Sequence, residues 1–108
     1  MIKRVKLNKK KIAKVIKGDA TLEQAYSDGK GNYCVIGGLL HAAGCNVEKE
    51  FAHYNTYNVA NIPLAWLRVL TDTYGLTMQQ AAQLQFVNDE HRVTTERRKA
   101  LLSKLAEL

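Results

Sequence analysis

A cysteine at the start of an apolar helical segment is the residue in this chain whose type and position best suit covalent chemistry. Cys34 opens the run Cys-Val-Ile-Gly-Gly-Leu-Leu, and the N-terminus of a helix lowers the pKa of a thiol in its first turn. Papain-like hydrolases place their nucleophile in such a position. His41 lies seven residues further along the same helix, about 10 Å away, so only His53 or His91 could act as the base.

The alternative is that Cys34 is structural, and we favour it. No Asp or Asn marks either remaining histidine as an oriented base, and a buried cysteine that behaves as a small apolar residue is the commoner case. Cys34 and Cys45 are two thiols without a second pair or a Cys/His cluster at ligand spacing. Neither a disulfide framework nor a metal site is therefore predicted, and no cofactor is expected.

Two adjacent glycines, Gly37 and Gly38, lie inside the same helical segment. Each costs about 1 kcal/mol relative to alanine in a helix interior. Close approach of a second backbone is the ordinary reason for accepting that cost. A phosphate-binding loop is disfavoured, because the segment lacks both a preceding strand and the Gly-Lys-Ser/Thr ending.

The net positive charge of the chain comes entirely from its N-terminal segment, residues 1–18. The chain has a net charge of +6, yet the residues after position 17 hold eight basic and ten acidic side chains. Such a segment can bind nucleic acid, bind an acidic protein surface, or remain a solvated face. No Ser, Thr or aromatic side chain is interleaved to contact bases. The basic residues predicted to bind a partner are Lys3, Arg4, Lys6, Lys9, Lys10, Lys11, Lys14 and Lys17.

Helix start and stop signals are frequent in the first half of the chain. Asn8 can cap a helix that ends at Gly18, and the pair Thr21 and Gln24 forms a capping box for a short helix. A helix over residues 34–43, with Gly44 as its left-handed terminator, is apolar on nearly all sides. An all-round apolar helix belongs in the interior, so this one is predicted to be central and buried.

The second half of the chain predicts three more helices. One begins near Pro63 and closes at Gly75, and a second begins at a Thr77–Gln80 capping box and stops around Asn88-Asp89. The last runs from Thr94 or Thr95 to the C-terminus. On this closing helix leucines 101, 102 and 105 are expected to face inward, and the basic residues Arg97, Arg98, Lys99 and Lys104 outward.

The fold class predicted is all-α: a compact single domain, residues 1–108, of five or six short helices around a buried central helix at about residues 34–43. The only candidate strand is a short N-terminal one over residues 2–7. No apolar stretch approaches the length of a membrane span, so no membrane partner is expected and cytoplasmic residence is the default.

Two short motifs resemble a group of small phage and bacterial helical proteins. Cys34-Val35-Ile36-Gly37-Gly38-Leu39 fits their Cys-x-(Leu/Ile)-Gly-x-Leu pattern, and Leu84-Gln85-Phe86-Val87-Asn88-Asp89 fits a downstream hydrophobic-Asn-Asp pattern. The resemblance spans residues 32–105 and implies a small helical protein, but it implies no particular activity for this chain. It implies that Cys34, Gly37, Asn88 and Asp89 meet in space.

The resemblance and the charge together lead to the functional hypothesis. Small phage proteins often inhibit or modulate host machinery, so the chain is predicted to be a non-enzymatic binding protein that engages a host nucleic-acid-processing or defence complex. Direct nucleic-acid binding is the first alternative, and a hydrolase using Cys34 is the second. Tyr54 and Tyr57, in the least regular stretch, are predicted as further binding residues.

A structural role is predicted for the pair Asn88 and Asp89. Side-chain oxygens at the end of a helix can accept from unpaired backbone N–H groups, including those at the start of the Cys34 helix. Asp89 is expected to be that internal brace, and neither a catalytic acid nor a metal ligand.

Overall fold

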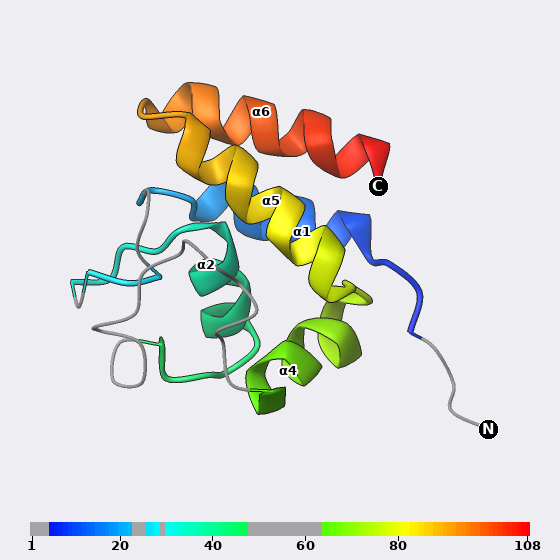
Figure 1. The fold of residues 1–108 in the computed structure, drawn as a ribbon. Helices are drawn as coiled ribbons and strands as arrows, with labels where there is room; N and C mark the ends of the chain where they lie inside the picture. The colour runs from blue at the N-terminus through cyan, green and yellow to red at the C-terminus, as the bar shows by residue number, and fades with distance from the viewer. Residues whose placement is uncertain (1–4, 23–25, 29, 48–63) are drawn as a thin grey trace.

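The described parts of the chain form helices and loops. The computed structural model describes residues 5–22, 26–28, 30–47 and 64–108. Its helices are α1 (Lys9–Gly18), α2 (Val35–Ala42), α4 (Leu64–Tyr74), α5 (Met78–Glu90) and α6 (Thr94–Glu107) (Figure 1). These ranges contain no strand, only an isolated antiparallel bridge between Ser27 and Tyr33. The all-α prediction is confirmed. Residues 5–7 of the candidate N-terminal strand are not extended into a sheet, and residues 2–4 lie outside the described ranges.

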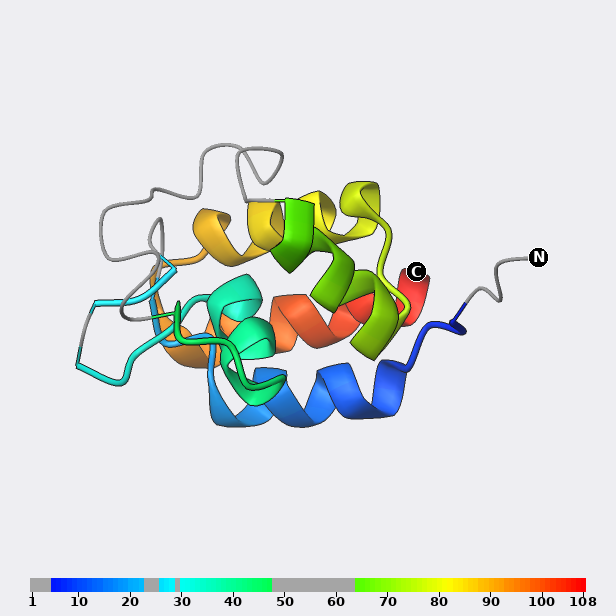
Figure 2. The same ribbon diagram turned by 90° about the horizontal axis from the view of Figure 1, so that it is seen from below.

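Helix α2 is the centre of the structure. It contacts α1, α4 and α5, and every residue from Val35 to Leu40 is buried. Figure 2 shows α1 along one outer edge, α4 and α5 on the opposite side, and α2 and α6 between them. The four large apolar side chains of α2 each contribute about 1.5–3 kcal/mol by leaving water. They belong to one apolar core with buried residues of the other described helices: Ile12, Ile16, Leu70, Tyr74, Ala81, Leu84, Leu101 and Leu105.

The helix boundaries follow side-chain and glycine signals in the sequence. Asn8 Oδ1 accepts from a first-turn N–H of α1, and the Thr77–Gln80 capping box is complete at the start of α5. Gly44 and Gly75 have φ angles of 96° and 74°, which is the left-handed conformation expected after α2 and α4. These four predictions are confirmed.

Helix α1 ends at Gly18, as predicted, but the segment that follows it differs from the prediction. Gly18 is the last helical residue, and the left-handed residue is Ala20, with a φ of 62° and a fully buried side chain. Thr21 and Leu22 are not helical, because both backbone N–H groups donate to the Tyr33 carbonyl. The capping-box helix predicted from residue 21 is therefore wrong at its start, and residues 23–25 lie outside the described ranges.

Helices α1 and α6 lie antiparallel. Lys9, at the start of α1, reaches the Ala106 carbonyl near the end of α6, and Arg98, near the start of α6, reaches the Asp19 carbonyl after α1. Helix α5 packs along α6 and does not contact α1. None of the described helices is both long and apolar enough to cross a membrane.

Candidate functional site

A face of three lysines runs along the outside of α1. Lys10, Lys14 and Lys17 follow one another at spacings of four and three residues, which places them on one side of the helix. They lie opposite the buried Ile12 and Ile16, and all three are exposed. We call Lys10, Lys14 and Lys17 the lysine face.

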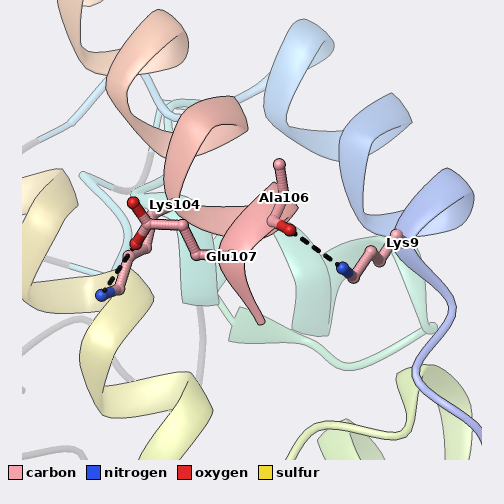
Figure 3. Close-up of polar contacts among 4 residues, drawn as sticks. All are labelled: Lys9, Lys104, Ala106 and Glu107. Carbon is pink, nitrogen blue, oxygen red and sulfur yellow. Dashed lines mark hydrogen bonds and ion pairs between the residues drawn. The ribbon is translucent and has the colours of Figure 1, made fainter.

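The other two lysines of α1 are also exposed, but they lean toward neighbouring helices. Lys9 Nζ donates to the Ala106 carbonyl at 3.2 Å, which Figure 3 shows between the first turn of α1 and the last turn of α6. Lys11 Nζ lies 5.7 Å from the centre of the Tyr74 ring. Each contact fixes the direction of a lysine side chain, but neither partner carries a negative charge. Lys9 and Lys11 therefore add to the positive potential at the edges of the lysine face.

No carboxylate of the described residues forms an ion pair with a lysine of α1. Within the described residues the only ion pair joins Lys104 and Glu107, 3.4 Å apart on α6 (Figure 3). The hydrogen bond from Arg98 Nε to the Asp19 carbonyl, 2.9 Å long, brings the Arg98–Lys99 turn next to the end of α1. Helix α5, which does not contact α1, contains no Lys, Arg or His. The positive potential therefore extends over α1 and the adjoining part of α6.

The remaining predicted binding residues stand outside this face or outside the described ranges. Lys6 is exposed in the segment before α1. Lys3 and Arg4 precede the described residues, and Tyr54 and Tyr57 fall in the range 48–63, which the structure does not describe.

Cys34 is the N-cap of α2. Its Sγ accepts from the Gly37 N–H at 3.3 Å, and the side chain is fully buried. Burial raises the pKa of the Cys34 thiol to about 12, and the hydrogen bond from Gly37 opposes this only in part. Nucleophilic catalysis requires an accessible thiolate. The geometry favours the structural interpretation of Cys34 over the hydrolase hypothesis.

Alkylation should distinguish the two thiols. At pH 8 we expect native Cys34 to resist iodoacetamide, because its thiol is buried and protonated, while the half-buried Cys45 reacts first. Mass spectrometry after digestion measures both sites, and the urea-unfolded chain, in which both should react alike, is the control. Rapid and selective labelling of Cys34 below pH 7 would restore the hydrolase hypothesis.

Asn88, on α5, connects this helix to the first turn of α2 and to the segment after α1. Its Oδ1 accepts from the Val35 N–H at 2.9 Å, and its Nδ2 donates to the Leu22 carbonyl at 2.9 Å and to Asp89 Oδ1 at 3.0 Å. Asp89 Oδ1 also accepts from Gln85 Nε2 at 2.9 Å. The expected contact with the first turn of α2 is present, but it is made by the amide of Asn88. The carboxylate of Asp89 holds that amide in place.

Gly37 and Gly38 are sites of close approach. A Cβ on Gly37 would lie 2.0 Å from the backbone oxygen of Tyr26, and a Cβ on Gly38 would lie 2.8 Å from the Asp19 Cβ. The expectation of a second backbone is confirmed at Gly37. At Gly38 the neighbour is a side chain.

Replacing a glycine by alanine raises the helix propensity at any helical position, but it also adds a methyl group that must fit. Two such substitutions should separate these effects. Gly37→Ala is expected to lower the free energy of unfolding by about 2–3 kcal/mol, because the added methyl group meets rigid backbone. Gly18→Ala is the matched control, since nothing lies within 4 Å of its Cβ position, and it should stabilise the chain by about 0.5–1 kcal/mol. Urea denaturation measures both changes. Equal effects from the two substitutions would contradict the close approach at Gly37.

Arg97 is buried, contrary to the prediction that it faces outward. Only 2% of the residue is exposed. Its guanidinium donates to four backbone carbonyls at 2.9–3.1 Å, those of Ala20, Asn88, His91 and Arg92. Three of these carbonyls close the end of α5, where the helix dipole favours a cation. The sequence contained a signal for this burial. Arg97, Leu101 and Leu105 follow one another at four-residue spacing, so they share one side of the helix.

The described residues include no group of three His, Cys, Asp or Glu side chains arranged to hold a metal ion. Comparisons with protein-family models, with curated proteins and with solved structures found no match for this chain.

Proposed function

We propose that this chain is a small, non-enzymatic binding protein that engages an acidic surface of a host macromolecular complex through the lysine face of α1. The observation that supports this most is that all five lysines of α1 are exposed and none forms an ion pair with a carboxylate. A concentrated positive potential steers encounters with acidic partners. The resemblance to small phage proteins supports a protein complex in the host cytoplasm as the partner.

Direct nucleic-acid binding is the second candidate, and one observation favours it. The Arg98–Lys99 turn of α6 lies next to the end of α1, so cations from two antiparallel helices lie on one side of the molecule. Such an arrangement suits repeated phosphate contacts. The exposed side of α1, however, has only lysines and Gly18. It offers no side chain suited to reading bases, so any such binding would be independent of sequence.

The test compares two triple variants with equal loss of charge. Lys10→Gln, Lys14→Gln and Lys17→Gln together remove the lysine face, while Lys30→Gln, Arg68→Gln and Arg92→Gln remove three exposed cations elsewhere. We expect the first variant to lose at least about tenfold in affinity for the partner, and the second to bind like the wild type. Exposed substitutions of this kind leave the stability within about 0.5 kcal/mol each.

The binding measurements separate the two candidates. Pull-down from host lysate with and without nuclease identifies a protein partner whose capture survives the nuclease. Titration of bulk DNA and RNA over a range of salt concentrations reports phosphate contacts, and the lysine-face variant should reduce the slope of log K against log salt by about 0.9 for each lost contact. Equal binding by the two triple variants would show that the lysine face only keeps the chain in solution.

A further inference from the structure

The outward side of α5 carries an exposed apolar row. Phe86 is 68% exposed and Met78 is 53% exposed. Together with Ala82 they repeat every four residues, so they lie on one side of the helix. Single exposed apolar residues are common on protein surfaces, but a phenylalanine in the middle of an apolar row marks a surface that other proteins can cover.

A hollow lies directly beside Phe86, between α5 and α6. Its volume is about 420 Å³, and its walls include Ala82, Gln83, Phe86 and Val87 of α5 and Lys104 of α6. The small side chain of Ala82 leaves this space open one turn before the ring of Phe86. A projecting aromatic side chain and a cavity able to receive one therefore adjoin each other on the same surface.

We infer that this α5 face binds a second copy of the same chain. A two-fold symmetric interface requires one patch that is complementary to itself, which a ring beside a hollow provides. Charge favours the same patch, because two chains of net charge +6 repel each other and α5 itself contains no basic residue. The hollow has one basic side chain in its wall, Lys104 of α6, and the carboxylate of Glu90 lines the same hollow. The second copy thus meets the least repulsion where the apolar contact is available.

An antiparallel pairing of the two α5 helices satisfies the polar groups as well. When Phe86 lies opposite the second copy's Ala82, Gln79 falls opposite the second copy's Asp89 and next to its Glu90. The two Gln83 residues then lie one residue away from the two-fold axis. The amide of Gln79 can then donate to the carboxylate of Glu90. Because α1 does not contact α5 and lies on the opposite side of the molecule (Figure 2), both lysine faces stay open. This inference does not depend on what the lysine face binds.

Light scattering coupled to size-exclusion chromatography tests the inference with the full chain. We expect a mass that rises with concentration from 12.1 kDa toward twice that value. Phe86→Glu should raise the dimer dissociation constant by about tenfold or more without changing the circular dichroism spectrum. The control is Leu64→Glu on α4, where an equally prominent apolar side chain, 73% exposed, is replaced away from the interface.

Cross-linking tests the geometry independently. In a Cys45→Ser background, Gln83→Cys should form a disulfide-linked dimer under mild oxidation, and Lys14→Cys on α1 should not. A wild-type chain that stays at 12.1 kDa up to its solubility limit would overturn the inference and leave the α5 face to another protein. Unchanged dimerisation by Phe86→Glu, or cross-linking of Lys14→Cys as efficient as that of Gln83→Cys, would also overturn it.

Discussion

Arg97→Ala is expected to lower the free energy of unfolding by about 3–5 kcal/mol, a large part of the total stability of a small domain. The substitution leaves the carbonyls that close α5 and the buried Ala20 carbonyl without their donor. Each hydrogen bond to a charged group contributes about 1.5–3 kcal/mol, and a buried acceptor left unpaired adds its own cost. Urea denaturation, followed by circular dichroism, measures the difference.

Two further variants make the Arg97 result specific. Arg97→Lys keeps the charge, but a single ammonium cannot span four carbonyls, so more than half of the loss should remain. Arg98→Ala removes the neighbouring arginine, whose Nε donates only to the Asp19 carbonyl, and should cost about 1 kcal/mol. If Arg97→Ala were no more destabilising than Arg98→Ala, the buried guanidinium would not be a major support of the fold.

Asn88→Asp is expected to destabilise the chain by about 3–5 kcal/mol at pH 7. The aspartate keeps the shape of the side chain and can still accept from the Val35 N–H, but it cannot donate to the Leu22 carbonyl. In the wild type the carboxylate of Asp89 accepts from the Asn88 amide. In the variant a second carboxylate takes the place of that amide. Like charges at such a distance cannot both be ionised without a penalty.

The pH dependence of Asn88→Asp should reveal the cause. Burial and the neighbouring carboxylate raise the pKa of the introduced aspartate in the folded state. The penalty is therefore fully present above that folded-state pKa, and it shrinks as the pH falls toward the pKa of the unfolded chain. Asn88→Ala introduces no titrating group. The difference between its free energy of unfolding and that of the wild type should therefore not shrink as the pH falls. Parallel pH profiles for the two variants would contradict this account of the Asn88 site.

The sequence was sufficient to predict the features that depend on neighbouring residues. The caps at Asn8 and Thr77 involve groups three residues apart, and the left-handed glycines after α2 and α4 act within one turn. The burial of α2 follows from its apolar composition alone. Local patterns of this kind are visible before any tertiary contact is known.

The features that were missed depend on groups far apart in the chain. The acceptors of Arg97 include a carbonyl 77 residues away, and the chemical type of an arginine indicates an exposed position unless those acceptors are known. The start of α2 shows the same limit. The side chain of Asn32, an ordinary capping residue, bonds instead to Thr21 and Asp28, and the sulfur of Cys34 caps the helix.

The supports of α2 also have a kinetic meaning. The bonds that Asn88 makes to Val35 and Leu22 join residues 53 and 66 positions apart, so each requires the closure of a long loop. Contacts of this range lower folding rates below those of bundles with local contacts, and those that form after the transition state act mainly by slowing unfolding. Loss of the Asn88 bonds is therefore expected to speed transient opening of the fold, and with it proteolysis, even when the apolar core is unchanged.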